Sequence, residues 1–266
     1  MTRFRHSREA CPRPDRGAGI QGNHPRRPWT PAFAGVTALE TFYRGIILNT
    51  TAFKLNGDQI AGIGLGPWAE EIKMIPSIQE CFDLMDKYHM LENIKAHSVV
   101  VARVTCLIAQ GLREAEVDIS VEMAIAAALM HDIGKTASLK SGQDHSEIGR
   151  QICLENHLDE IAPIVAEHVR LRSYTLNGDY SEKEIVYYSD KRVNHDKIVN
   201  LDERLAYILG RYGRNQEQLS QAIKRNFSLC EEVQEKLFKK LKFSPESLSV
   251  TVDGFTGFPL TAGFEG

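Results

Sequence analysis

The sequence predicts an all-α fold for its central part, and three observations support this prediction. Apolar residues recur at helical spacing over residues 91–112. Ser77 is followed three residues later by Glu80, which is the pattern of a capping box at a helix start. Between Met74 and Lys242 no segment alternates apolar and polar residues as a half-buried strand does. We therefore expect a compact helical bundle with irregular extensions at both ends.

Composition divides the 266 residues into three segments. Residues 1–73 begin with an arginine- and proline-rich stretch that lacks a helical period, so we expect an irregular extension outside the fold. Its first part resembles translated intergenic repeat DNA, and we hypothesise a misassigned start codon with Met74 as the natural start. Residues 74–243 are the predicted domain. Residues 244–266 lose the helical period after a Ser-Pro pair, and we expect a loose tail there.

The predicted helices follow one another with short connections. They begin after Ser77 and then cover residues 91–112, 123–130, 145–157, 160–171, 182–193, 196–212 and 216–241. Asp118 or Ser120 can cap the helix that ends at Met130, because both side chains accept hydrogen bonds from free backbone amides. A glycine-rich patch at residues 57–66 matches no phosphate-binding loop, and we interpret it as a loop.

Charge and cysteine usage limit the classes of function. A net charge of −3 gives no basic field for nucleic acid or for an anionic membrane. The five cysteines are scattered and include no CxxC pair, which suits a reducing cytoplasm rather than a disulfide framework. No apolar run approaches the roughly 20 residues of a membrane span. We expect a cytoplasmic protein that binds neither nucleic acid nor membrane, and the sequence leaves homo-oligomerisation open.

An apolar helical run is followed by the string His131-Asp132-Ile133-Gly134-Lys135. Imidazole and carboxylate groups are both metal ligands, so the His-Asp pair can place two ligands at one helix end. Gly134 lets the chain turn sharply past that end, and Lys135 adds a cation beside the pair. A lone His-Asp pair is common by chance, so its interpretation depends on the residues around it.

Four further candidate ligands accompany the pair along the chain. His97 lies upstream in a predicted helix, His145 and His168 lie downstream, and Asp190 comes last, near the end of another predicted helix. The order His, His-Asp, His, His, Asp resembles the HD-domain metal-dependent phosphohydrolases. The string that begins with the His-Asp pair resembles the HDIG variant of that family. The resemblance covers nearly all of the predicted domain.

This resemblance implies an HD-domain helical bundle with a site for one or two divalent metals. The implied ligands of the first metal are His97, His131, Asp132 and Asp190. Asp132 would bridge to a second metal held by His145 and His168. Val169 stands where several relatives carry a second histidine. The resemblance leaves the metal open among manganese, iron, nickel, magnesium, cobalt and zinc.

The implied activity is hydrolysis of a nucleotide or a related small phosphate ester by metal-activated water. Asp132 and Lys135 are the predicted catalytic residues, and Lys135 would bind a nonbridging phosphate oxygen. Other nearby cations, which either line the pocket or face solvent, are Arg170, Arg172, Lys191 and Arg192. Two alternatives use the same ligand order: an HD-type di-iron oxygenase and a non-catalytic regulatory or binding module. Oxygen uptake and iron spectra distinguish the first alternative, and turnover of any substrate excludes the second.

Overall fold

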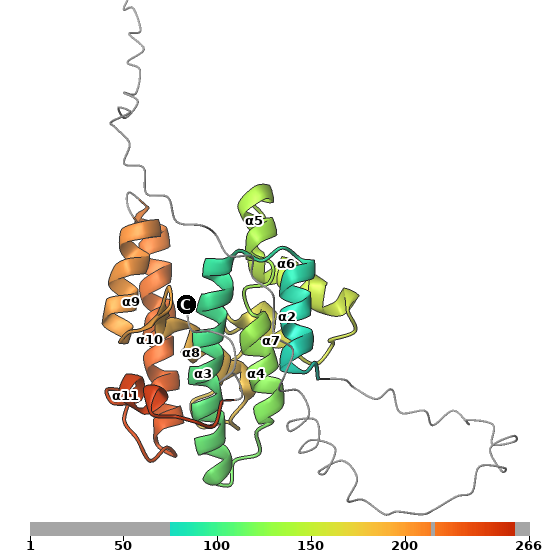
Figure 1. Ribbon diagram of the computed structural model, residues 1–266. Helices are drawn as coiled ribbons and strands as arrows, with labels where there is room; N and C mark the ends of the chain where they lie inside the picture. Colours follow the sequence, from blue (N-terminus) through green and yellow to red (C-terminus); the bar gives the residue numbers. More distant parts are fainter. Residues whose placement is uncertain (1–74, 214–215, 259–266) are drawn as a thin grey trace, which may run out of the picture. The chain divides into compact units, whose positions relative to one another are not determined.

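The computed structural model describes residues 75–213 and 216–258 of the chain (Figure 1). The chain divides into two units, Met1–Gly66 and Pro67–Gly266, and all described residues belong to the second. The predicted extension at residues 1–73 and the start-codon hypothesis therefore lie outside the described residues.

The described part is all-α apart from one short pair of strands, which confirms the predicted fold class. In chain order the elements are α2 (Ile78–Lys87), α3 (Glu92–Glu114), α4 (Val121–Met130), α5 (Lys135–Ser141), α6 (His145–Glu155), α7 (Ala162–Glu167), α8 (Glu182–Lys191), β1 (Val193–Asn194), β2 (Lys197–Ile198), α9 (Leu201–Ile208), the π-helical turn η1 (Leu209–Gly213), α10 (Glu217–Phe238) and α11 (Leu248–Asp253).

Helix starts follow the capping signals in the sequence. The capping box predicted at the start of α2 is present, because the side chains of Ser77 and Glu80 each accept a hydrogen bond from the backbone amide of the other residue. Ser120 caps α4 by accepting the Met123 amide. Asp144 accepts the Ser146 amide and so makes His145 the first residue of α6.

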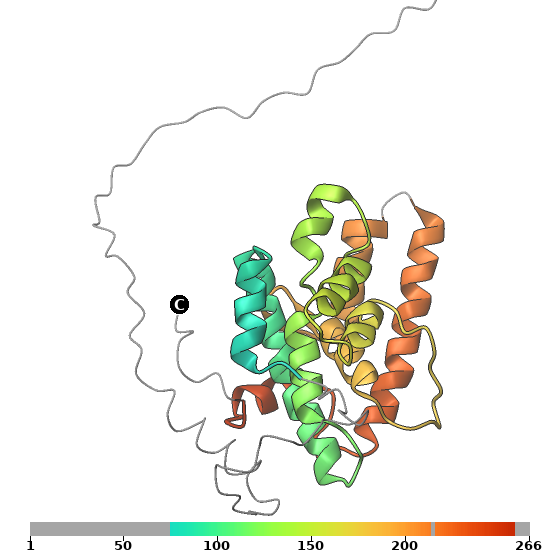
Figure 2. The same cartoon turned by 90° about the vertical axis from the view of Figure 1, so that its right-hand side faces the viewer.

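The core forms around α4, whose apolar residues are buried on all sides. α3 and α4 run side by side in both views and make the most extensive helix pair (Figures 1 and 2). α8 packs against α3, α4, α7 and α10. Because α3, α4, α7 and α8 share this core, side chains far apart in sequence are held at one place.

One predicted helix is shorter than expected, and a hairpin replaces its start. β1 and β2 pair antiparallel, and His195 turns the chain between them with a left-handed φ of 57°. Asn200 and Glu203 form a second capping box, so α9 begins only at Leu201. The sequence gives no strand signal here because each strand has two residues.

The expectation of a loose tail is wrong for part of residues 244–266. α11 lies within this segment, and Leu248 and Val252 on one of its faces are fully buried. Phe258 is also buried, and Arg103 of α3 donates a hydrogen bond to the Val252 carbonyl. The sequence signal was weak because α11 is a six-residue helix between glycine- and proline-containing stretches.

Two expectations from composition concern the described residues. None of the described helices combines the length and the apolar character that a bilayer crossing needs. Within the described part the cysteines are free thiols, all buried in the core: Cys81, Cys106, Cys153 and Cys230.

Candidate metal centre

Three of the predicted ligands meet where α3, α4 and α8 come together. His97 extends from the N-terminal part of α3, His131 follows the last residue of α4, and Asp190 lies near the end of α8. The Asp190 Oδ1 atom lies 3.1 Å from His97 Nε2 and 3.7 Å from His131 Nε2. These three ligand atoms form one group that can hold a metal ion.

Asp132 connects this group to a second one through its two carboxylate oxygens. Its Oδ2 atom lies 3.5 Å from His131 Nε2, on the side of the first group. Its Oδ1 atom lies 3.4 Å from His145 Nε2 and 3.6 Å from His168 Nε2. The two imidazole nitrogens of His145 and His168 are 3.1 Å apart. This is the arrangement that a bridging Asp132 requires.

Backbone carbonyls fix the orientation of three of the four imidazoles. The Nδ1 atoms of His97, His131 and His168 lie 2.7 Å from the carbonyl oxygens of His195, Ala128 and Val165 respectively. A carbonyl oxygen only accepts, so each Nδ1 carries the proton and each Nε2 of a neutral ring presents its lone pair. All three lone pairs therefore point toward the carboxylates.

These groups fit a divalent cation. Two ligands about 2.1 Å from one ion lie about 3.0 Å apart at octahedral angles and about 3.4 Å apart at tetrahedral angles. The distances from Asp190 Oδ1 to its two imidazole nitrogens, and those among Asp132 Oδ1, His145 and His168, run from 3.1 to 3.7 Å. All three ligand atoms of the first group lie within 4.8 Å of one another. His131 Nε2 is fully buried and has no hydrogen-bond partner among the described residues. A buried lone pair without a donor is costly, and a metal ion would satisfy it.

The charges of the site act on one another. Burial alone would raise the pKa of Asp132, but His131 and Lys135 hold it well below the usual range. The pKa of Asp190 is likewise well below its usual range, because the Lys191 charge, the contact with His97 and the charge of Arg204 outweigh the effect of its burial. Both carboxylates are thus ionised, as a metal ligand must be.

The imidazoles differ in their affinity for protons. Burial lowers the pKa of His131, yet the Asp132 and Asp190 carboxylates more than offset it and the net pKa is raised. Burial and the neighbouring His168 lower the pKa of His145 to about 4. The pKa of His168 is lowered by burial as the main cause. Metal binding requires neutral imidazoles, so protons compete with a metal ion more strongly at His131 than at the other two rings.

Lys135 lies directly beside the centre. Its Nζ atom is 2.7 Å from Asp132 Oδ2, and 37% of its side chain is exposed. His145 is 26% exposed, whereas the side chains of His131, Asp132 and His168 are almost completely buried. Lys135 and His145 are thus the most exposed side chains of the centre, followed by Asp190 at 15%.

Gly134 is required for close approach and not for a left-handed turn, since its φ is −77°. A Cβ at this position would lie 2.3 Å from the His145 carbonyl oxygen and 2.6 Å from the Gly149 amide. Both distances are far below van der Waals contact. Gly134 thus lets the start of α6 approach the end of α4, which brings His145 to Asp132.

Sequence reasoning missed two residues around the centre. His195 orients His97 through its backbone carbonyl, which has no signal in a sequence. Arg204 of α9 lies 3.8 Å from Asp190 Oδ1 through its Nη2 atom and belongs to no motif. Arg204 and Asp190 are far apart along the chain. They meet because the hairpin β1–β2 folds α9 back toward α8.

The other candidate cations have different positions. Lys191 is buried behind Asp190 and donates to the His168 carbonyl at 2.6 Å. Arg192 is buried and bonds to Tyr188 and to the carbonyls of Val199 and Pro245, so it joins the hairpin to the segment before α11. The other two candidates, Arg170 and Arg172, are exposed to solvent.

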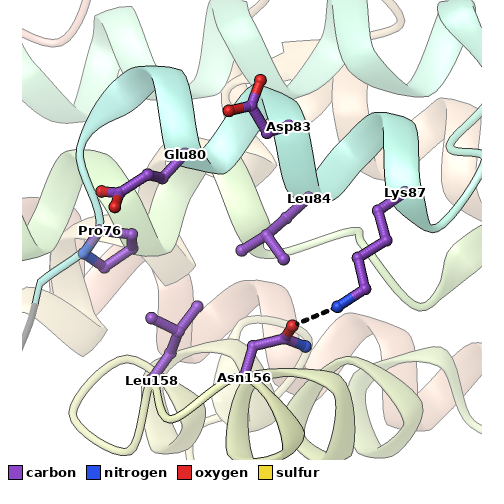
Figure 3. A pocket seen from close by; sticks show the side chains of 7 residues that line it. All are labelled: Pro76, Glu80, Asp83, Leu84, Lys87, Asn156 and Leu158. Carbon is purple, nitrogen blue, oxygen red and sulfur yellow. Dashed lines mark hydrogen bonds between the residues drawn. The ribbon is translucent and has the colours of Figure 1, made fainter.

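A separate surface pocket lies between α2 and the connection that follows α6 (Figure 3). Lys87 of α2 donates across it to Asn156 Oδ1 at 2.8 Å. Leu84 and Leu158 provide an apolar part of its wall. None of the candidate metal ligands lines this pocket, so it does not belong to the metal centre.

Comparison with known families agrees with this geometry. The HD domain family matches residues 94–225. The chain belongs to the HD-domain family. This is a family of metal-dependent hydrolases, and the HD match contains all six candidate ligands. The HDIG subtype stays a prediction.

Two relatives are similar over parts of their length. A tRNA (cytidine(56)-2'-O)-methyltransferase of Thermoplasma volcanium is 29% identical over 101 residues, which are 38% of this chain and 28% of the methyltransferase. An uncharacterised protein of Methanocaldococcus jannaschii is 24% identical over 148 residues, which are 51% of this chain and 86% of that protein. The chain thus spans little more than a quarter of the methyltransferase. No solved structure matches the chain significantly.

Proposed function

We propose that this HD-domain protein is a metal-dependent phosphohydrolase that hydrolyses a nucleotide or another small phosphate ester. The observation that supports this most strongly is the convergence of Nε2 lone pairs on two carboxylates, with His131 Nε2 buried and unpaired among the described residues. Such a set of nitrogen and oxygen ligands without cysteine suits a catalytic metal with open positions rather than a closed structural zinc site.

The six ligands divide between two positions in this proposal. His97, His131, Asp132 and Asp190 would hold the first ion, and Asp132, His145 and His168 would hold the second. A divalent ion held there supplies charge neutralisation for the phosphate and acidifies a water molecule. The candidate metals are manganese, iron, nickel, magnesium, cobalt and zinc.

Lys135 has two roles in this proposal. It keeps Asp132 ionised by their 2.7 Å contact, and its partly exposed ammonium binds a nonbridging phosphate oxygen. Its pKa is raised, because the Asp132 carboxylate outweighs the effect of burial. Lys135 therefore remains a cation throughout the physiological pH range.

The proposed substrate is a small molecule rather than nucleic acid. The chain carries a net charge of −3 and so lacks an overall basic field. The name of the Thermoplasma relative refers to tRNA, but the shared region is only 28% of that enzyme. A cytoplasmic location agrees with the free, buried cysteines.

The test is an activity screen of protein loaded with each candidate metal against phosphomonoesters, phosphodiesters and nucleotides. We expect hydrolysis by the wild type and loss of both metal and turnover in Asp132→Ala. Mutation of a residue that only hydrogen-bonds to a metal ligand typically lowers metal affinity about 10–100-fold, and removal of a ligand itself should lower it further. Normal hydrolysis by Asp132→Ala would refute the proposal. Oxygen consumption by the iron-loaded protein, without phosphate release, would instead indicate an oxygenase.

A further inference from the structure

Three cations surround the two carboxylates of the metal centre, and they are not equivalent. Lys191 is 6% exposed, donates to the His168 carbonyl, and lies 4.0 Å from the centre of the Tyr187 ring. Its ammonium is therefore occupied by the protein itself. Lys135 and Arg204 accompany different carboxylates, Asp132 and Asp190 respectively.

Arg204 has donor capacity to spare. Asn194 Oδ1, 3.0 Å from Nη1, is the hydrogen-bond acceptor that the described residues offer to its guanidinium. A guanidinium has five N–H donors, so most remain for a ligand. Arg204 Nη2 approaches Asp190 Oδ1 only to 3.8 Å, beyond hydrogen-bond distance. His97 Nε2 lies closer to this carboxylate oxygen, at 3.1 Å.

The contacts that position the Arg204 side chain also suit a binding role. Its guanidinium lies 5.7 Å from the centre of the Tyr207 ring, one helical turn further along α9. The Tyr207 ring in turn contacts the His195 ring at 5.3 Å. Asn194, His195 and Tyr207 thus hold the arginine against the hairpin that orients His97, so its position is fixed relative to the first metal group.

We propose that Arg204 binds a phosphate oxygen of the substrate in addition to Lys135, and that the preferred substrate is a phosphate monoester. This inference rests on the proposed function. A terminal phosphate has three nonbridging oxygens, and the site offers three kinds of cationic contact: the metal centre, Lys135 and Arg204. A diester has two nonbridging oxygens and would leave one of these cationic contacts without a partner. The cost of removing that cation from water would then not be compensated.

The experiment measures binding of inorganic phosphate to the metal-loaded protein by calorimetry, together with metal content. The variants are Arg204→Gln, Arg204→Lys and the control Arg225→Gln, which removes an exposed arginine from α10. We expect phosphate affinity to fall about 10–100-fold in Arg204→Gln, since a hydrogen bond to a charged group contributes on that scale. Arg204→Lys should recover part of it, and the control should bind like wild type.

The metal content distinguishes direct binding from an indirect effect. Unchanged metal stoichiometry in Arg204→Gln supports a direct contact with phosphate. Loss of metal along with phosphate would overturn the inference, because Arg204 would then act through Asp190. Unchanged phosphate affinity would overturn it as well.

Matched substrates test the preference for monoesters. We expect p-nitrophenyl phosphate to show a higher kcat/KM than bis(p-nitrophenyl) phosphate, and Arg204→Gln to reduce this ratio. Faster turnover of the diester by the wild type would refute this inference and leave the proposed function standing. A wild type that hydrolyses neither ester with any metal would refute the proposed function itself.

Discussion

Individual hydrogen bonds decide which atoms of the centre are free for a metal. His97, His131 and His168 each donate a hydrogen bond from Nδ1 to a backbone carbonyl, at 2.7 Å in every case. This leaves Nε2 as the ligand atom and prevents the rings from turning over. The three carbonyl partners are residues that no ligand motif contains.

The six candidate ligands were named from the sequence, but the residues that support them were not. All six candidate ligands lie close together in the structure, because the helices that carry them pack around α4. The carbonyl of His195 and the guanidinium of Arg204 were missed, since their proximity depends on a hairpin of two-residue strands. Hairpins this short leave no periodic signal.

The lowered pKa of His145 predicts how the metal-free protein responds to acid. Burial and His168 lower this pKa from 6.5 to about 4, so the unfolded chain binds the proton more readily than the folded chain. The contribution to stability is complete above pH 6.5 and is lost as the pH falls toward 4. In the presence of chelator, the thermal midpoint of His145→Gln should therefore fall less between pH 6.5 and 4 than that of the wild type. Equal losses would contradict this assignment.

At the scale of elements, two glycines allow α6 to pack closely against its neighbours. A Cβ on Gly134 would overlap the backbone at His145 and Gly149. A Cβ on Gly149 would lie 2.8 Å from Val165 Cγ1, so this glycine also lets α6 approach α7 closely. The sequence indicated a turn at Gly134, but only the packing of α6 shows the reason for the glycine.

Gly134→Ala should destabilise the fold and weaken the second metal group in particular. Overpacking costs about 1–3 kcal/mol, and the neighbours here are backbone atoms that cannot rotate away. The matched control is Gly210→Ala, where a Cβ meets nothing within 4 Å. Chemical denaturation and metal titration of both variants provide the measurement. A fully stable Gly134→Ala with normal metal stoichiometry would show that the close approach is unnecessary.

α11 extends the fold beyond the segment that the sequence marked as helical. Its buried face packs toward α3, whereas Val250 on the opposite face is 76% exposed. Leu248→Ala should reduce the free energy of unfolding by about 2–5 kcal/mol, as for other buried leucines. Val250→Ala in the same helix should change it by less than about 0.5 kcal/mol. Similar values for the two variants in urea denaturation would argue against a packed α11.

At the scale of the whole molecule, the candidate ligands come from five regions of the bundle. α3, α6 and α8 carry one each, and the ends of α4 and α7 provide the others. Helical periodicity predicted these helices from sequence. It did not predict their relative placement, which depends on how the apolar faces pack around α4.

A ligand set of this kind couples metal binding to folding. The unfolded chain does not bring these side chains together, so an ion bound only by the folded state stabilises it. At a free metal concentration 100 times the dissociation constant the gain is about 2.7 kcal/mol. The thermal midpoint should rise with added metal and fall with chelator, and it should not respond in Asp132→Ala. A response of equal size in that variant would locate the binding elsewhere.

The most direct measurement is an anomalous difference map from crystals of the manganese-loaded protein. We predict a peak about 2.0–2.2 Å from the Nε2 atoms of His97 and His131 and from Asp190, with Asp132 facing a second peak near His145 and His168. One peak at the first position already supports the central claim. Manganese bound only at other sites, with these six side chains uncoordinated, would contradict it.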